Sequence, residues 1–344
     1  MDYVIGYYML EDDAYTSNPQ SYFMGGSAIV QNYSGSGESE AIFGQFSYRF
    51  AEDWSVTLGA RSTEEDKTGF KEYVGIISAS GEGSFDDTTS TFIIEHDFSE
   101  NTNVYFKVAE GFKAGGFNAE SSNPFAASTP YAPETIESTE LGLKGRYLDN
   151  RMMLNVAYFD NEHEDMQISY FNADAAAASE VINNSASISG LEIESMTMLN
   201  DSTVLTLNFS TRDSECTGNK TAHDGFLLEN IPYSPEKTLY ASLEKDFGAY
   251  RVRLDHTRVD EHPSFPYNSK DFRAVLTNID SNAKTDLLVL TEPMENLQLN
   301  FWVRNLTNEY HQSSAISFGP GFGYLTVGYF DAPRTFGMDL HYSF

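Results

Sequence analysis

The chain has 344 residues, with 51 acidic and 21 basic side chains and a formal net charge of −30. This balance argues against a nucleic-acid partner, because phosphate contacts need Lys and Arg, and the single Cys216 excludes an internal disulfide framework. The mean hydropathy is −0.39, and no apolar run approaches the roughly 18 residues of a membrane-spanning helix.

Aromatic residues make up 14% of the chain, with 21 Tyr and 25 Phe against 2 Trp. This excess favours strands and the interfacial girdles of membrane barrels over a helical core. A barrel also tolerates a low mean hydropathy, because its strands alternate apolar and polar residues. Residues 1–13 lack a basic segment followed by an apolar one, so any signal peptide is expected to lie outside this sequence.

Strand-like segments recur along the chain, and the connections between them alternate between short and long. The expected strands are residues 2–10, 39–50, 54–65, 88–98, 103–113, 135–147, 151–164, 186–199, 203–213, 236–247, 249–259, 284–291, 297–304 and 332–344. Every second connection is a turn of about one to five residues. The others are expected to be loops of roughly 20 to 27 residues, including the segment after residue 10 and residues 67–87.

The long connections therefore lie on one side of the sheet and the short turns on the other. Long structureless loops are uncommon inside compact soluble domains, but outer-membrane barrels have short periplasmic turns and long outer loops. The sequence predicts an all-β fold, an antiparallel transmembrane β-barrel with about 14 strands. The alternative, a large soluble β-sandwich or solenoid, predicts no regular alternation of loop lengths.

The alternation within the strands supports a lipid face. In the segment 297–304, Leu297, Leu299, Phe301 and Val303 share one face, and polar or charged residues dominate the other. Period two indicates that one face is buried in an apolar environment and the other is wet. Basic residues expected on the wet lumen face are Arg61, Lys144, Arg146 and Arg304, which could contact a plug or an anionic substrate, or pair with acids such as Glu140.

The last strand ends on the final residue of the chain. From residue 336 on, every second position is apolar, as Phe336, Met338, Leu340, Tyr342 and Phe344. A terminal aromatic residue is typical of an outer-membrane barrel whose last strand reaches the membrane interface. If this strand runs down to the periplasm, every long connection lies outside the cell.

Five segments of the chain resemble the C-terminal barrel portion of the TonB-dependent outer-membrane receptors. They are FGQFSYRFAEDWSVTLGAR (43–61), YFKVAEGFKAGGFN (105–118), PETIESTELGLKG (133–145), WVRNLTNEY (302–310) and PRTFGMDLHYSF (333–344). They occur in the order of the family. Three of these segments have a direct physical interpretation. Gly115 and Gly116 are expected to permit a turn with positive φ, and Pro133 to stiffen the start of a strand. Asn305 and Asn308 are expected to cap backbone groups locally.

The resemblance implies a 22-stranded barrel with an N-terminal plug, which takes up a scarce, large solute, most often a ferric siderophore. Residues 1–344 are then the C-terminal part of the barrel domain, and the plug, the energy-coupling segment and the signal peptide are expected to lie outside this sequence. Two alternatives remain: a passive outer-membrane pore of 14 strands and a non-transporting β-rich surface protein. No enzyme and no cofactor is expected.

Ligand contacts are expected from aromatic residues near the outer loops. The candidates are Tyr22, Phe23, Phe112, Phe117, Phe125, Tyr131, Phe318, Phe322 and Tyr324. The resemblance also implies that the terminal strand, through Phe336, Tyr342 and Phe344, carries a signal read by the outer-membrane assembly machinery. The further partners it implies are outer-membrane lipid and lipopolysaccharide, and the TonB energy-transducing complex.

No metal site is predicted. The seven His residues have no metal-like spacing, and the acidic segment 160–165 is expected to be a solvated strand end rather than a calcium site. The segment Phe272–Val275 is similar to one motif of haem receptors, but it ends in Val where that motif has Pro.

Overall fold

The computed structural model describes residues 1–20, 29–119, 121, 124–172, 178–221, 227–267, 272–318, 323 and 325–344. One antiparallel sheet of 14 strands dominates it, and each strand pairs with its neighbour in chain order. The strands are β1 Asp2–Gln20, β2 Ile29–Arg49, β3 Trp54–Tyr73, β4 Ile77–Ser99, β5 Thr102–Lys113, β6 Glu134–Tyr147, β7 Met152–Asn172, β8 Ala178–Asn200, β9 Thr203–Cys216, β10 Lys237–Asp246, β11 Tyr250–Val259, β14 Asn282–Met294, β15 Leu297–Arg304 and β18 Thr335–Tyr342.

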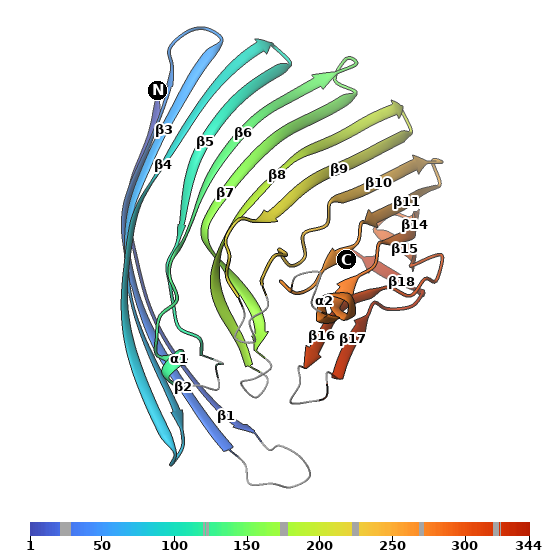
Figure 1. Cartoon of the computed structure of the whole chain (residues 1–344). Coiled ribbons are helices and arrows are strands. Elements are labelled where there is room, and N and C mark those ends of the chain that lie inside the picture. The colour runs from blue at the N-terminus through green and yellow to red at the C-terminus, as the bar shows by residue number, and fades with distance from the viewer. Residues whose placement is uncertain are drawn as a thin grey trace.

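Short elements lie in the longer connections, toward the lower end of the sheet as drawn in Figure 1. They are the helices α1 Pro124–Ala127 and α2 Phe272–Thr277, the paired strands β12 His262–Pro263 and β13 Asn278–Ile279, and the paired strands β16 Gln312–Phe318 and β17 Leu325–Phe330. None of the helices in the described residues has the length and apolar character needed to cross a membrane.

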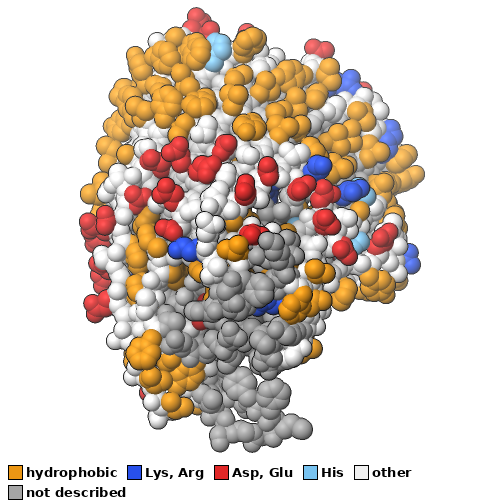
Figure 2. Space-filling model, viewed as in Figure 1, with side chains coloured by type: hydrophobic (Ala, Val, Ile, Leu, Met, Phe, Trp, Pro, Cys, Tyr) orange, Lys and Arg blue, Asp and Glu red, His pale blue; other side chains and the backbone are white. Residues whose placement is uncertain are grey.

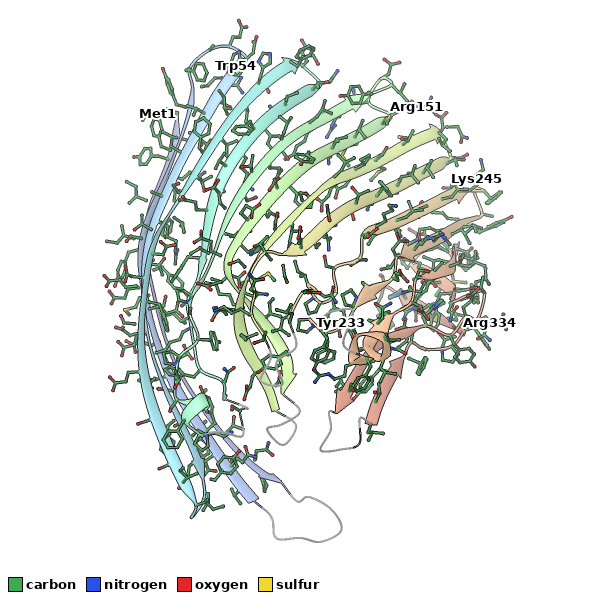
Figure 3. All side chains as sticks on the ribbon, in the orientation of Figure 1. Met1, Trp54, Arg151, Tyr233, Lys245 and Arg334 are labelled. Carbon is green, nitrogen blue, oxygen red and sulfur yellow. The ribbon has the colours of Figure 1, made fainter. Side chains whose placement is uncertain are left out.

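The predicted order of the fourteen strands is confirmed, and the short turns lie together at the opposite end of the sheet. Figure 3 places Trp54, Arg151 and Lys245 along this short-turn rim, at the top of the view. The turns contain backbone conformations with positive φ, including Asn150 (65°) and Gly248 (85°). Such conformations suit Gly and Asn, and they let the chain reverse within a few residues.

Three of the predicted long loops are wrong. In the segment 165–185, β7 and β8 pair from Met166 with Asn184 to Asn172 with Ala178. β1 and β2 pair without interruption from Asp2 with Ser47 to Gln20 with Ile29, and β3 and β4 continue to a turn at residues 74–76. The segments around residues 11–38 and 67–87 are polar on both faces, so they lack the apolar alternation used to predict strands. The inter-strand hydrogen-bond ladder holds residues 11–20, 29–38, 67–73 and 77–87 in β-conformation without an apolar face.

The outward face of the wall carries an apolar band next to the short turns. In β3, Trp54, Val56, Leu58 and Ala60 lie on this face. Their register partners continue the band, so that Leu58 is opposite Phe92. Exposed apolar side chains on a β-wall are typical of contact with lipid hydrocarbon.

Farther from the short turns, beyond the apolar band, the same face becomes acidic. From here on, 'above' and 'upper' mean away from the short turns, a direction that Figure 1 draws downward. Glu40, Glu64 and Asp86 are register partners on β2, β3 and β4, and all three side chains are exposed. β3 has 20 residues, which gives a length of about 66 Å at roughly 3.3 Å per residue, whereas a barrel strand crosses the hydrocarbon in roughly 9 to 11 residues. About half of this wall therefore projects beyond the lipid, and Figure 2 shows hydrophobic side chains over the short-turn end of the visible face, at the top of the view, and acidic ones across its middle.

The last strand follows the predicted alternation. Phe336, Met338 and Leu340 on β18 are opposite Val303, Phe301 and Leu299 on β15, and all of them belong to the outward face. Phe336 is 81% exposed, which suits a lipid-facing residue. Asp339 lies between them on the opposite face, which we call the inner face.

Candidate ligand-binding site

A segment of the connection between β5 and β6 folds back against the inner face of the wall. We call residues 114–132 the strap. Its α1 helix contacts β3 and β4, and Phe117 lies against Gly69 and Gly81, where any larger residue would meet its ring. The described residues of the strap are therefore packed onto the wall rather than extended into solvent.

Two lysines of β3 fasten the strap to the wall. Lys67 Nζ donates a hydrogen bond to the carbonyl oxygen of Gly115 (3.1 Å), and Lys71 Nζ donates one to that of Ala119 (2.7 Å). Lys71 is buried. A buried ammonium group is stable only when its donors are satisfied, so these bonds fix the position of the strap.

Two asparagines fasten the strap to β8 on the other side. The Asn118 side chain donates to Val181 O and accepts from Val181 N, and the Asn183 side chain donates to Ala132 O and accepts from Ala132 N. Each asparagine thus uses its amide as a substitute for a backbone partner in a β-ladder. The strap consequently joins β3 and β8, which are separated by four strands of the wall.

Gly115 and Gly116 have a different role from the predicted one. Neither residue is among those with positive φ. A side chain at Gly115 would overlap Tyr131 O and the Phe85 ring, so glycine is required here for close approach. The capping prediction for Asn305 is confirmed, because its side chain accepts a hydrogen bond from Glu309 N (3.0 Å) and donates one to Glu309 O (2.8 Å).

A cavity of about 580 Å³, which we call the upper cavity, lies between β1–β5 and the strap. It combines aromatic, basic and acidic side chains. It is lined by Tyr8, Leu10, Asp12, Gly37, Ser39, Arg61, Thr63, Glu65, Lys67, Thr89, Gly111, Phe112, Lys113, Ala114, Tyr131 and Gln167. Mixed aromatic and polar linings of this size are typical of small-molecule sites.

Arg61 lies near two aromatic rings of this wall, which belong to β1 and β2. Its guanidinium carbon is 5.3 Å from the centre of the Tyr8 ring and 5.7 Å from that of Phe43. Its Nε donates a hydrogen bond to Thr63 Oγ1 (3.0 Å). Within the described part of the chain no carboxylate forms an ion pair with it, so its two terminal nitrogens remain available to a ligand.

A polar network closes one side of the upper cavity. Gln167 donates from its side chain to Ala114 O (2.9 Å) and to Ala132 O (3.3 Å), and Glu134 accepts hydrogen bonds from the Gln167 backbone N–H (2.9 Å) and from His163 (3.0 Å). Burial by itself raises the pKa of Glu134, but the bonds from His163 and Gln167 outweigh it and lower the pKa below its usual value.

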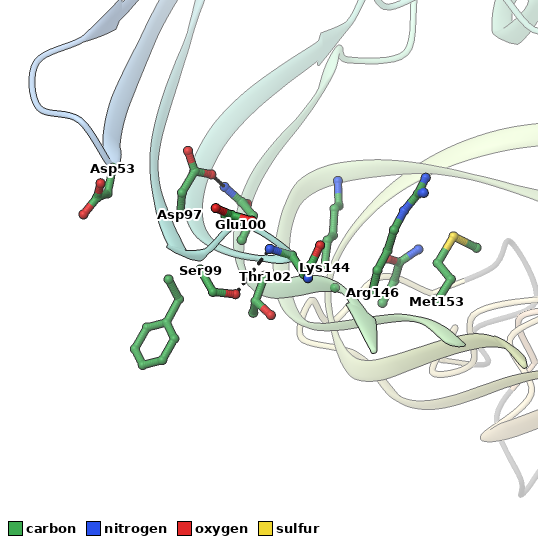
Figure 4. A pocket seen from close by; sticks show the side chains of 13 residues that line it. Asp53, Asp97, Ser99, Glu100, Thr102, Lys144, Arg146 and Met153 are labelled. Atoms are coloured by element: carbon green, nitrogen blue, oxygen red, sulfur yellow. Dashed lines mark hydrogen bonds between the residues drawn. The ribbon is translucent and has the colours of Figure 1, made fainter. Parts of the chain in front are cut away.

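A second cavity, of about 650 Å³, lies on the inner face at the short-turn end (Figure 4). It is lined by Asp53, Asp97, Phe98, Ser99, Glu100, Asn101, Thr102, Asn103, Lys144, Gly145, Arg146, Met153 and Asn155. In Figure 4, Lys144 and Arg146 point the same way from β6. We call it the lower cavity.

The predicted lumen cations lie on the inner face. By strand register Arg61, Lys144, Arg146 and Arg304 share that face, and the alternation prediction is confirmed there. Glu140 is engaged by Tyr105 and by Lys107 instead (3.7 Å). Among the residues that the structure describes, none of the four predicted cations forms an ion pair.

The predicted ligand aromatics have different surroundings. Phe112 and Tyr131 line the upper cavity, Phe117 is packed on the wall, and Phe125 on α1 is 63% exposed. The backbone of Phe318 belongs to β16, but its side chain lies outside the described part. The candidates Tyr22, Phe23, Phe322 and Tyr324 also lie outside the described residues.

The structure gives the other predicted motifs ordinary roles. Described His, Cys, Asp and Glu side chains form no group of three able to hold a metal ion. In the acidic segment 160–165, Glu162 and Glu164 are exposed at the upper part of β7. In the segment similar to a haem-receptor motif, Arg273 is buried in α2, with its guanidinium carbon 4.3 Å from the centre of the Tyr267 ring.

Comparison with known proteins identifies a single family over most of the chain. Residues 2–306 match the family described as TonB dependent receptor-like, beta-barrel. The ferric yersiniabactin uptake receptor FyuA from Yersinia pestis is similar in structure, with a TM-score of 0.83 at 18% identity over 100% of this chain and 51% of that one.

Two further solved structures have the same fold. The ferric-catecholate import receptor Fiu from E. coli K12 has a TM-score of 0.72 at 16% identity, over 98% of this chain and 50% of that one. The ferric citrate transporter FecA has a TM-score of 0.73 at 15% identity, over 99% of this chain and 51% of that one. The chain spans about half the length of these structures.

Proposed function

Because the chain belongs to the family of TonB-dependent receptor-like β-barrels, we propose that it forms part of a receptor for active uptake of a ferric siderophore or a similar large, scarce solute. Proteins of this family are outer-membrane receptors and not enzymes, so the apolar band of the sheet faces outer-membrane lipid. The observation that carries the proposal is the upper cavity, because it places aromatic and basic side chains on the inner face, at the end away from the short turns.

The position of the upper cavity supports this function. The short turns face the periplasm in this family of barrels, so the upper cavity opens toward the outside of the cell, where a solute arrives. The strap lies against it and is held by hydrogen bonds from β3 and β8. A bound solute would therefore contact a preformed wall, which lowers the entropic cost of binding.

Three of the similar structures are named for iron complexes, as a ferric yersiniabactin receptor, a ferric-catecholate receptor and a ferric citrate transporter. These names support iron complexes as the first substrates to test. The proposal includes a plug and a TonB-contacting segment outside this sequence, as well as lipid, lipopolysaccharide and the assembly machinery as partners. Residues 1–344 would then be the C-terminal part of the barrel domain.

Uptake of iron-55 complexes by cells tests the function. A strain that lacks the gene would be compared with the same strain carrying the intact gene, using ferric citrate, a ferric tris-catecholate and ferrioxamine B. We expect saturable uptake of at least one complex that requires the gene and stops when a protonophore collapses the proton gradient. Gene-dependent uptake that is linear in concentration and insensitive to the protonophore would contradict the proposal and support a passive pore.

A further inference from the structure

We infer that Arg61 forms an anion-binding subsite of the upper cavity, which holds a carboxylate or catecholate oxygen pair of the transported iron complex. This inference rests on the proposed uptake function. It adds that the substrate is an anion and that Arg61 is the residue that recognises its charge. The structural basis is the pairing of a free guanidinium edge with two flanking aromatic rings.

The charges of the wall are sorted between its two faces. On the outward face of β2–β5, above the apolar band, the charged residues are all acids, and Glu40, Glu64 and Glu110 are examples. The lysines and arginines of the same strands, such as Arg61 and Lys67, lie on the inner face. Although the chain has a net charge of −30, the basic residues of these strands lie on the face that carries the upper cavity.

The charged residues that line the upper cavity are Asp12, Arg61, Glu65, Lys67 and Lys113. Lys67 is neutralised, because its Nζ is 2.6 Å from Glu65 Oε1. Lys113 is the register partner of Glu134 and interacts electrostatically with that carboxylate. Arg61 is therefore the lining cation that has no acidic partner among the described residues, and Asp12 is the one remaining acid of the lining. An anion that enters the cavity can pair with Arg61 without displacing a carboxylate from it.

The geometry of Arg61 favours a flat, two-oxygen anion. Its Nε already donates to Thr63 Oγ1, and its guanidinium carbon lies 5.3 Å and 5.7 Å from the centres of the Tyr8 and Phe43 rings. The remaining terminal nitrogens present parallel N–H donors, which match the oxygen pair of a carboxylate or a catecholate. Tyr8 and Tyr131 add aromatic faces against which a catechol ring can pack.

Binding to the purified intact receptor in detergent tests the subsite. The probes are iron-55 ferric citrate, which carries carboxylates, a ferric tris-catecholate, which carries catecholates, and ferrioxamine B, a cationic complex. We expect at least one anionic complex to bind, Arg61→Gln to weaken its binding about 10-fold to 100-fold, as loss of a charge-assisted bond does, and Arg61→Lys to restore part of the affinity.

The matched control is Arg253→Gln. Arg253 is another inner-face arginine, but it pairs with Asp255 (3.0 Å) and does not line the upper cavity. We expect this variant to bind normally. Heat-modifiable migration of each variant would show that the barrel is folded.

The possible outcomes separate the two proposals. Unchanged binding of an anionic complex by Arg61→Gln would overturn the subsite and leave the uptake function standing. Binding of ferrioxamine B alone would also overturn the subsite but not the function. Binding of none of the three complexes would contradict both.

Discussion

Asn118 and Val181, 63 residues apart in the chain, are joined by two hydrogen bonds: Asn118 Nδ2 donates to Val181 O (3.2 Å), and Val181 N donates to Asn118 Oδ1 (2.7 Å). This pair ties the strap to β8. We expect Asn118→Ala to leave two backbone groups of Val181 without these partners and to loosen the strap by about 1–3 kcal/mol. Hydrogen exchange over residues 114–132 measures this change.

The control for that change is Asn155→Ala. Asn155 donates to Glu194 on the exposed part of the wall (3.3 Å), so its loss should leave exchange in the strap unaltered. Equal exchange in the strap of Asn118→Ala and the unmodified receptor would contradict this role of Asn118.

Gly81 offers a second test of the strap. A side chain at this position of β4 would overlap the carbonyl oxygen of Ser128, whereas one at Gly59 on β3 would be no closer than 3.6 Å to Thr91 Cβ. We expect Gly81→Ala to displace the strap, increase protease cleavage within it and weaken ligand binding, while Gly59→Ala is tolerated. If both variants resist the protease equally, the strap does not pack on Gly81.

Which face of the sheet contacts lipid can be tested with two adjacent residues of β15. Phe301 on β15 faces outward and is 44% exposed, whereas Asn300 belongs to the inner face. Arg on the lipid side of a barrel costs about 2–4 kcal/mol at mid-depth. Phe301→Arg should therefore lower the amount of receptor in the outer membrane, and Asn300→Arg should not, as immunoblots of membrane fractions would show. If Asn300→Arg lowered the amount of receptor and Phe301→Arg did not, the assignment of the lipid face and the lumen face would be wrong.

The terminal residue Phe344 is expected to act in assembly. It lies at the end of the outward apolar row, and its ring is 5.2 Å from that of Tyr342 in an edge-on arrangement. We expect Phe344→Ala to reduce membrane insertion more than ligand binding by the receptor that does insert. The ratio of binding to inserted receptor measures this, and normal insertion of the variant would refute the prediction.

Glu134 is expected to make the stability of the region near the strap depend on pH. It lies above the apolar band, and its pKa is lowered from the usual 4.5, since burial raises it less than the bonds from His163 and Gln167 lower it. The folded carboxylate thus contributes stability above the unfolded pKa, and this contribution is lost as the pH falls through the lower folded pKa.

The measurement is hydrogen exchange of the strap and of residues 134–167 between pH 7 and pH 3. We expect Glu134→Gln to exchange faster than the unmodified receptor at pH 7 and equally fast once Glu134 is protonated. Glu137→Gln, on the exposed outward face of the same strand, is the control and should show no such difference.

The sequence predicts the strands where apolar alternation marks a lipid face, and it misses them where that alternation ends. Residues 54–60 were assigned correctly because Trp54, Val56 and Leu58 alternate with polar residues. Residues 67–73 of the same strand were assigned to a loop, because the projecting wall is held by its ladder and not by an apolar face.

The site was harder to predict than the fold. Arg61 could be placed on the inner face because it alternates in step with Thr57. Its position near the Tyr8 and Phe43 rings depends on the register of β1, β2 and β3, which pair across two connections. The partners of Lys71 and Asn118 lie 48 and 63 residues away. Such contacts have no local sequence pattern.

The location of iron in the intact receptor tests the central claim most directly. A crystal of the receptor with the ferric complex that it transports would be measured at the iron absorption edge. We predict an anomalous peak in the upper cavity, beside Arg61 and between the strap and β1–β5. A peak in the lower cavity beside Lys144 and Arg146, or on the outward face of the wall, would contradict this account.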